Sequence, residues 1–295
     1  MLFFAAFIWG IAFVAQKAAS SVSLFALCTS RSIIAAIVLI PAVMLFDRLS
    51  KNERKLFSSR GIDVTRRELI GGILCGISLF TATALQQAGI NGTDAGKASF
   101  ITALYVVIVP IYALIFKRKS PLNVWLGVGI AVIGFYLLCI KDDLSVLPAD
   151  LLVFACAFVY AIQIMTIDHF AASCDGVRLS LIQFFTVSLL SFAGSLIFEG
   201  IGSFATVSEC IPEILFLGVG SSGIAYTLQI IGQKNTHPAV ASIVLSLESV
   251  IGAVASALIL GEVLSAREYV GCAIVFISVV ISQLDLSFIF GKAHR

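Results

Sequence analysis

The sequence predicts an all-α polytopic membrane protein of ten transmembrane helices, arranged as two inverted five-helix repeats around a central cavity. Three observations predict this class. Apolar stretches of membrane-crossing length fill nearly all of the 295 residues. Hydrophobic residues make up 59% of the chain and charged residues only 12%, about half the share of roughly 25% that is usual in globular domains. In addition, part of the first half of the chain recurs in the second half.

Each predicted helix is a run of about 20 apolar residues, which crosses roughly 30 Å of hydrocarbon at about 1.5 Å per residue. Strands of a membrane barrel would instead alternate in polarity over about ten residues. The longest gap between runs, 47–68, is too short to fold as a soluble domain. The ten runs, in chain order, are Leu2–Ala19, Leu24–Phe46, Leu69–Ala88, Ala95–Phe116, Val124–Ile140, Leu151–Ile167, Leu179–Phe198, Ile214–Ile231, Ala239–Leu260 and Tyr269–Leu284.

The first run has an alternative interpretation as the apolar core of a secretory signal peptide, over Leu2–Val14. A signal peptide carries basic residues before its apolar core, and this run has no such leader. We therefore expect a membrane helix at this position.

The distribution of basic residues predicts the orientation, because lysine and arginine near helix ends stay on the cytoplasmic side. Alternate loops and the tail carry 14 of the 19 basic residues, whereas the opposite loops carry Lys17, Lys141 and Arg267. Both termini are therefore expected in the cytoplasm. The loop after the second run has an alternative role in binding anionic lipid or nucleic acid, but orientation suffices to explain it, and we expect no nucleic-acid partner. The 14 residues are Arg48, Lys51, Arg54, Lys55, Arg60, Arg66, Arg67, Lys117, Arg118, Lys119, Arg178, Lys234, Lys292 and Arg295.

An internal repeat predicts the arrangement of the helices. Leu85–Ile108 aligns without gaps on Leu228–Ile251, with nine identities in 24 positions, so the third and fourth runs match the eighth and ninth. Five helices per half is an odd number, so the two halves lie in opposite orientations. Inverted repeats are typical of secondary transporters, with the substrate site at the repeat interface. We expect one repeat over 1–140 and another over 151–285. The identical pairs are Leu85/Leu228, Gln86/Gln229, Gly89/Gly232, Thr93/Thr236, Ala98/Ala241, Ser99/Ser242, Leu104/Leu247, Val107/Val250 and Ile108/Ile251.

Short motifs occur in five of the runs. They are Phe7-Ile8-Trp9-Gly10 with Phe13-Val14, then Arg31, then Ala103-Leu104-Tyr105 to Pro110, then Gly127 to Leu138, and finally Leu247-Glu248 with Leu260-Gly261-Glu262. Together they resemble the drug/metabolite transporters that contain two EamA-type repeats, and the resemblance covers essentially the whole chain. It implies movement of small organic solutes, frequently outward, without an ATPase or a cofactor. Two positions depart from the family pattern: Ser249 stands where proline often follows the glutamate, and Lys117–Lys119 replace an acidic ending.

Glu248 is the only carboxylate predicted deep in the membrane. A charge at the centre of a lipid-facing helix costs on the order of 3 kcal/mol, so we expect Glu248 to face protein or a wet cavity. Proton coupling and binding of a substrate amine are two hypotheses for it, and a packing role is the alternative. Helical periodicity gives this run an apolar face, which we expect to contact lipid. Which of its two other faces lines the pathway stays open. The apolar face consists of Ile243, Leu247, Val250 and Val254.

Arg31 lies about 10 Å inside the predicted outer end of its helix. One interpretation is that it attracts a carboxylate or phosphate group of the substrate. The other is that its long side chain snorkels to the outer surface. The sequence leaves both open.

Amide and aromatic side chains supply the remaining site residues. Glutamines orient a polar solute without a net charge, and hydrogen bonding between helices is their alternative role. Aromatic rings with polar tips suit small organic ligands, and interfacial belts are their alternative. Gln86 and Gln229 are repeat partners, so we expect them to approach the cavity from opposite membrane sides. The residues expected to bind substrate are Trp9, Arg31, Gln86, Tyr105, Tyr160, Gln163, Tyr226, Gln229 and Glu248.

The chain contains no phosphate-cradling GxxxxGKS/T, no HExxH and no GxSxG motif, and its seven cysteines lack CxxC spacing. We therefore expect no enzymatic activity, no metal and no cofactor. The predicted function is secondary transport of small polar organic metabolites, amino-acid-like or drug-like, by alternating access in the export direction, with proton coupling as a hypothesis. The alternatives are a gradient-independent facilitator or importer, a membrane enzyme acting on lipids, and a non-transporting receptor. The expected partners are the bilayer and a small-molecule substrate, and the chain is a monomer or homodimer.

Overall fold

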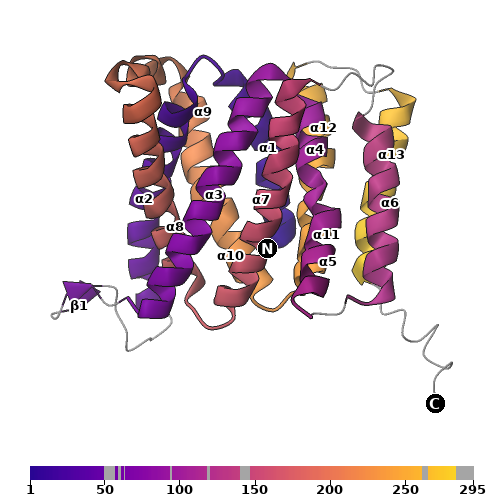
Figure 1. Cartoon of the computed structure of the whole chain (residues 1–295), viewed down its shortest axis with the longest axis horizontal. Helices are drawn as coiled ribbons and strands as arrows, with labels where there is room; N and C mark the ends of the chain where they lie inside the picture. Colours follow the sequence, from indigo (N-terminus) through magenta and orange to yellow (C-terminus); the bar gives the residue numbers. More distant parts are fainter. Residues whose placement is uncertain are drawn as a thin grey trace.

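The computed structural model describes residues 1–49, 57–58, 61–62, 64–93, 95–117, 120–139, 147–260 and 265–283. The described chain is a bundle of upright helices, with a two-residue β-ladder outside it (Figure 1). The elements are α1 (Leu2–Ala18), α2 (Leu24–Leu49), β1 (Phe57–Ser58), β2 (Gly61–Ile62), α3 (Arg66–Gly92), α4 (Ala95–Ala103), α5 (Tyr105–Ile115), α6 (Leu122–Cys139), α7 (Pro148–Ala171), α8 (Gly176–Gly194), the π-helix η1 (Ser195–Glu199), the 3-10 helix η2 (Ile201–Cys210), α9 (Ile211–Leu215), the π-helix η3 (Phe216–Ala225), α10 (Tyr226–Gln233), α11 (Pro238–Leu245), α12 (Leu247–Leu260) and α13 (Ala266–Gln283).

The predicted all-helical membrane fold is confirmed, and each of the ten apolar runs coincides with one helix or with consecutive helices. Seven helical segments of the described chain are long and apolar enough to cross a membrane, and Leu2–Ala18 and Leu122–Leu137 are shorter apolar helices. The sequence did not predict the 3-10 helix η2, which joins the end of η1 to α9.

Polar side chains fix several helix ends. Thr65 and Glu68 form a capping box that begins α3, and the carboxylate of Asp175 caps the first turn of α8. At the other end of α3, Lys17 Nζ donates to the carbonyls of Ile90 and Thr93, both at 3.0 Å. A cation at a helix C-terminus satisfies free carbonyls and complements the helix dipole.

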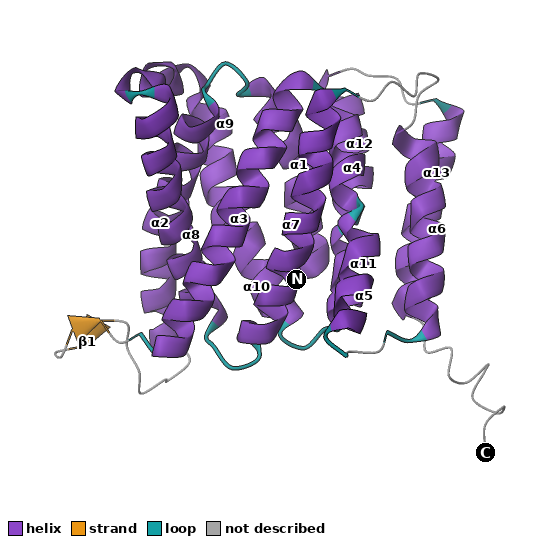
Figure 2. Ribbon diagram, in the orientation of Figure 1, coloured by secondary structure: helices purple, strands orange, loops and turns teal. Residues whose placement is uncertain are grey.

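The fourth and ninth predicted helices are each interrupted at a single residue, Leu104 between α4 and α5 and Ser246 between α11 and α12. Each interruption contains a tighter backbone bond, from Val107 N to the Leu104 carbonyl and from Ser249 N to the Ser246 carbonyl. Figure 2 shows an interruption about midway along the bundle. In the ungapped alignment of the repeats, Leu104 matches Leu247, so the two interruptions occur within one residue of the same repeat position.

The helices of the two halves interleave. α1 packs against α12 and η3, α3 packs against α7 and α8, and α2 packs against α8. The last helices of the two halves, α6 and α13, pair with each other at one edge of the bundle (Figure 1). The core is therefore built largely from contacts between the halves.

A close contact between helices occurs once in each half, and it helps to show which residues of the two halves correspond. A methyl group on Gly76 of α3 would lie 2.5 Å from Thr186 Cβ and 2.9 Å from the Gln183 carbonyl of α8. On Gly218 of η3, it would lie 2.7 Å from Cβ of Ile34 and 3.1 Å from the carbonyl of Arg31, both on α2. Glycine allows the helices to approach closely at both places. Gly72 makes a similar contact one turn earlier, 2.5 Å from Ile182 Cβ, but Gly76 lies within one residue of the position that the repeat alignment sets opposite Gly218. Gly76 therefore corresponds to Gly218, and Gln183 to Arg31.

The second half contains one extra residue next to this contact. Leu85 follows Gly76 by nine positions, whereas its repeat partner Leu228 follows Gly218 by ten. The π-helix η3 lies in that interval and accommodates the insertion, because a π-turn takes up one more residue than an α-turn.

The predicted lipid-facing side of the ninth helix is partly wrong. Ile243 is fully buried and Leu247 is 3% exposed, whereas Val254 is 41% exposed. The α6 and α13 pair covers the α11 end of this helix, and Ile243 Cδ1 would lie 3.4 Å from a methyl group on Gly127 of α6. Periodicity identified an apolar face but not the helices that pack on it.

The basic residues of alternate loops gather at one end of the bundle, the lower edge in Figure 1, where β1 also lies. Arg48, Arg66, Lys117, Arg178 and Lys234 all lie at or next to the ends of helices on this side. The side of the membrane that this end faces stays a prediction. The residues of the orientation argument that lie outside the described residues are Lys51, Arg54, Lys55, Arg60, Arg118, Lys119, Lys141, Lys292 and Arg295.

The second helices of the two halves, α2 and α8, are joined by polar contacts at both ends. At the basic end, Arg178 Nη2 pairs with Asp47 Oδ1 at 2.9 Å, and the two side chains are only 3% and 7% exposed. At the other end, the Glu199 carboxylate accepts from Phe25 N at 2.8 Å, from Ala26 N at 3.1 Å and from the Ser23 hydroxyl at 3.0 Å. Each acidic residue lies near the end of one helix and binds groups at the start of the other helix.

The ion pair leads to a stability prediction. Arg178→Met is expected to lower the free energy of unfolding by about 3 kcal/mol, because it removes a buried cation that pairs with the carboxylate of Asp47. The double variant with Asp47→Asn is expected to recover most of this loss. A thiol-reactive dye that reports exposure of the buried Cys75 and Cys156 during heating would measure it. Glu209→Gln, at an exposed position, is the control. Equal melting temperatures for Arg178→Met and the control would contradict the prediction.

Candidate functional site

A cavity lies among the helices around the two interruptions. Its walls come from α1, α2, α3, α4, α5, α7, α10, α11, α12 and η3, so both halves contribute. Its free volume is about 30 Å³. Because one water needs about 10–15 Å³ measured in this way, the cavity holds about two waters. The lining residues are Trp9, Ala12, Phe13, Gln16, Arg31, Gln86, Thr102, Tyr105, Tyr160, Gln163, Ile164, Ser221, Tyr226, Leu245 and Glu248.

Arg31 enters the cavity from α2, and its side chain is 5% exposed. Its Nε donates to the Ser222 hydroxyl at 3.1 Å and its Nη2 to the Ser221 hydroxyl at 3.5 Å. The structure therefore places the guanidinium inside the bundle and not at a surface to which it snorkels. Both serines belong to the π-helix η3, so the one-residue insertion of the second half supplies the groups that hold this cation.

The π-helix also positions the indole ring of the site. Trp9 Nε1 donates to the backbone carbonyl of Ser221 at 3.3 Å. Its ring lies 4.6 Å from that of Tyr226, centroid to centroid, and the Tyr226 ring contacts Phe184 of α8 at 5.5 Å. π-Helical turns leave carbonyls available to side chains and occur frequently at functional sites.

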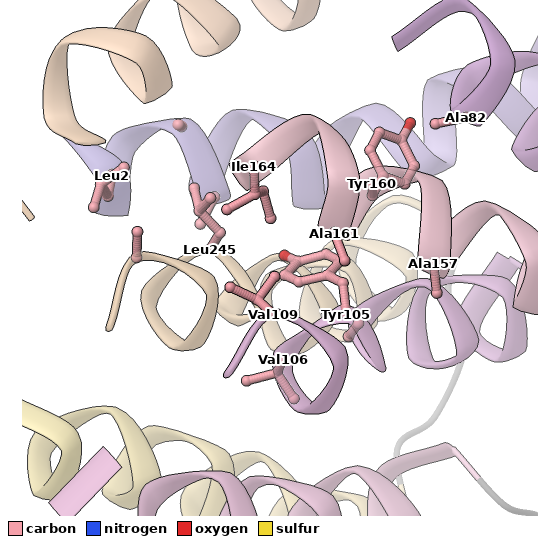
Figure 3. Close-up of a cluster of buried hydrophobic side chains, with 14 of the residues drawn as sticks. Leu2, Ala82, Tyr105, Val106, Val109, Ala157, Tyr160, Ala161, Ile164 and Leu245 are labelled. Atoms are coloured by element: carbon pink, nitrogen blue, oxygen red, sulfur yellow. The ribbon is translucent and has the colours of Figure 1, made fainter. Parts of the chain in front are cut away.

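Tyr105 and Glu248 meet at the centre of the fold. The Tyr105 hydroxyl donates to Glu248 Oε1 at 3.1 Å, and both residues are buried. Tyr105 directly follows the first interruption and Glu248 lies two residues after the second, and the ungapped alignment makes them repeat partners. Figure 3 shows Tyr105 and Val109 facing Ala161 and Ile164 of α7, all within the buried core. This hydrogen bond therefore connects the same position of the two halves.

A chain of hydrogen bonds crosses from α3 to α7 on one side of the cavity. The Tyr160 hydroxyl donates to Gln86 Oε1 at 3.1 Å, and Gln86 Nε2 donates to the Thr102 hydroxyl at 3.2 Å. Both amide atoms of Gln86 are thereby satisfied. The repeat partner of Gln86, Gln229, bonds from Nε2 to Gln163 Oε1 at 3.4 Å, and Gln229 does not line the cavity.

The charges of the cavity are separated. Within the described part of the chain, neither Arg31 nor Glu248 forms an ion pair, although both line the same cavity. A buried charge without a counter-charge is costly, so a cavity with one cation and one carboxylate suits a ligand that offers the complementary groups. Among the described residues, no group of three or more His, Cys, Asp or Glu side chains is arranged to hold a metal ion.

The structure brings eight of the nine predicted site residues to one cavity, and Gln229 lies outside it. Sequence reasoning missed Thr102, Ser221, Ile164 and Leu245 as lining residues. Thr102 bonds to Gln86, and Ser221 belongs to the π-helix. The sequence does contain a sign of the insertion in the second half: the spacing from Gly76 to Leu85 is one residue shorter than the spacing from Gly218 to Leu228.

Comparison with known proteins decides the family. A model of the EamA-like transporter family matches residues 1–140 and again residues 147–284. The chain belongs to the EamA-like transporter family. EamA-like proteins are part of the drug/metabolite transporter superfamily, which makes this chain a membrane transporter of that type.

A relative of this EamA-like chain is an uncharacterized transporter of Archaeoglobus fulgidus, 28% identical over 281 residues, covering 95% of this chain and 83% of the relative. A solved crystal structure has the same fold, with a TM-score of 0.74 at 16% identity, covering 96% of this chain and 94% of that one. Family and relative both point to a transporter and not to an enzyme.

Proposed function

We propose that this EamA-like protein is a secondary transporter that exports small amino-acid-like metabolites by alternating access. The observation that carries the proposal is that Arg31 and Glu248 line one small cavity without pairing with each other. In this conformation the cavity holds about two waters, so the helices must separate before a solute can enter. A cavity that is closed to solutes is what one intermediate of an alternating-access cycle requires.

The two charges suggest a zwitterionic solute. A carboxylate accepts bidentate hydrogen bonds from a guanidinium, so Arg31 is proposed to bind the carboxylate of the solute. Glu248 is proposed to bind its ammonium group. The rings of Trp9 and Tyr226 suit the organic part of the molecule, and the amide of Gln86 suits a polar substituent.

Glu248 also offers a route to energy coupling. A single carboxylate binds either a proton or an ammonium group, and not both. If the solute amine displaces the proton on one side of the membrane and a proton displaces the amine on the other, export is exchanged for protons. Intramembrane carboxylates serve in proton relays of this kind, and the Tyr105 hydroxyl holds Glu248 in place.

The proposed moving parts are the repeats over 1–140 and 151–285, in inverted orientation around the Tyr105–Glu248 contact. The basic end of the bundle is proposed to face the cytoplasm, with both termini on that side. Every lining residue comes from one chain, so the proposed unit of transport is the monomer, and a homodimer would contain two cavities.

The experiment that tests the function is flux in proteoliposomes of the purified protein, with a panel of amino acids, sugars, amines and nucleosides, with and without a pH gradient. Saturable flux of zwitterionic solutes that increases with the gradient is expected. Flux that does not change with the pH gradient would identify a facilitator. Faster flux in the import direction would identify an importer. No flux of any solute by a folded protein would overturn the proposal in favour of a receptor or a lipid enzyme.

A further inference from the structure

Four buried glutamines lie on the side of the cavity toward the basic end of the bundle, and one of them, Gln163, also lines the cavity. Gln163 is on α7, Gln183 on α8, and Gln229 and Gln233 on α10, and none is more than 1% exposed. Ser180 and Phe184, on either side of Gln183, contact Thr227 and Tyr226, which places Gln183 beside α10.

Several side-chain amide atoms of these glutamines have no hydrogen-bond partner among the described residues. Neither amide atom of Gln183 or Gln233 has a hydrogen bond within the described part of the chain, and Gln163 Nε2 and Gln229 Oε1 also have none. Buried polar groups are almost always hydrogen-bonded, so such a concentration requires an explanation. On the other side of the cavity, the repeat partner Gln86 has both of its amide atoms satisfied.

The register between the halves gives the explanation. Gln183 has in the second half the position that Arg31 has in the first, as the contacts of Gly76 and Gly218 and the repeat alignment together indicate. Arg31 and Gln86 line the first cavity. In an inverted repeat, the same positions of the other half line the pathway when the opposite side opens. Those positions are Gln183 and Gln229.

A second cavity lies at the basic end, near the end of α10. Its volume is about 310 Å³, which is within the usual size of small-molecule sites. Its lining includes Glu68, Cys174, Arg178 and Lys234. Lys234 directly follows Gln233 in the chain, so this cavity adjoins the end of α10 that carries Gln233.

We propose that Gln183, Gln229 and Gln233 line the second half of the solute pathway, which is closed in this conformation and leads from Gln163 in the wall of the first cavity to the 310 Å³ cavity as its mouth. The amides then gain the solute and water as partners when this half opens. The inference rests on the proposed transport function, and it names neutral amide groups as the contacts for a zwitterionic solute on this side.

Thiol labelling tests the proposal without knowledge of the solute. Gln183→Cys is expected to react with a membrane-impermeant thiol reagent applied at the basic end, in oriented membrane vesicles, with the modified peptide identified by mass spectrometry. The control is Phe185→Cys, two residues along α8 at a position that is 58% exposed on the lipid side, and it is expected to stay unmodified. Absence of labelling from either face, or equal labelling of both variants, would overturn the proposal. If Gln183→Cys does not fold, Gln229→Cys takes its place with the same expectations.

A second variant separates a pathway role from a packing role. Gln183→Leu removes two unpartnered polar atoms, so it is expected to leave Tm unchanged or higher while it lowers flux at least tenfold. The control is Gln87→Leu, a buried glutamine that does not line the cavity and bonds to Asn91, and it is expected to retain flux. Wild-type flux in Gln183→Leu would overturn the proposal while leaving transport intact. If the wild type moves no solute, the labelling result still decides this proposal.

Discussion

Replacing Glu248 with glutamine is expected to abolish the response of flux to a pH gradient. Glutamine has nearly the same shape and its carbonyl can still accept from the Tyr105 hydroxyl, so the hydrogen bond between α5 and α12 is kept. The amide binds neither a proton nor an ammonium ion as a carboxylate does. Loss of a charge-assisted hydrogen bond of about 1.5–3 kcal/mol also raises KM for an amine-bearing solute roughly 10–100-fold.

The measurement compares initial flux with and without an inward proton gradient in proteoliposomes of matched protein content. Glu248→Asp keeps the carboxylate and is expected to retain part of the gradient response. Tyr105→Phe keeps the carboxylate but removes the donor, and a fall in flux of about fivefold with the response intact is expected. A full gradient response in Glu248→Gln would exclude Glu248 from coupling.

Replacing Arg31 with glutamine is expected to remove the preference for solutes with a carboxylate. Two serine hydroxyls hold the guanidinium, and a carboxylate that binds there gains a charge-assisted contact worth about 2–5 kcal/mol, so its loss raises KM by about 100-fold. The substitution gives the first half the residue that the second half has at Gln183. Correct folding is therefore expected.

The measurement compares KM for an amino acid and for its methyl ester, which lacks the carboxylate. Arg31→Gln is expected to raise KM for the acid and to leave KM for the ester unchanged. Arg31→Lys keeps the charge but loses the bidentate geometry, so an intermediate KM is expected. An equal loss for acid and ester would assign Arg31 a structural role.

The ten helices could be predicted from the sequence because membrane-crossing length and apolarity are local properties. The interruptions at Leu104 and Ser246 could not, because neither residue is a helix breaker and the tighter turn depends on packing between the halves. The π-helix η3 is likewise a property of the duplicated fold, since the insertion appears only when Gly218 is set against Gly76.

The sequence predicted which residues form the site better than it predicted the contacts that these residues make. Glu248 and Arg31 stood out because ionisable residues are rare within membrane spans. Their separation could not be foreseen, because it depends on which residues each one reaches: Tyr105 from the other half, and the hydroxyls of Ser221 and Ser222. Gln229 was placed in the cavity by symmetry with Gln86, but in this conformation its side of the fold is closed and it bonds to Gln163.

The interleaving of the two halves has a consequence for biosynthesis. Arg31 and Ser222 are 191 residues apart in the chain, and Trp9 and Ser221 are 212 apart. At a synthesis rate of roughly 5–20 residues per second, the serine hydroxyls that bind the arginine of α2 are synthesised on the order of 10–40 s after α2 itself. During that time a guanidinium and an indole N–H lack their final partners in the membrane. The first half must therefore remain in a sheltered or incompletely inserted state until the second half has been made.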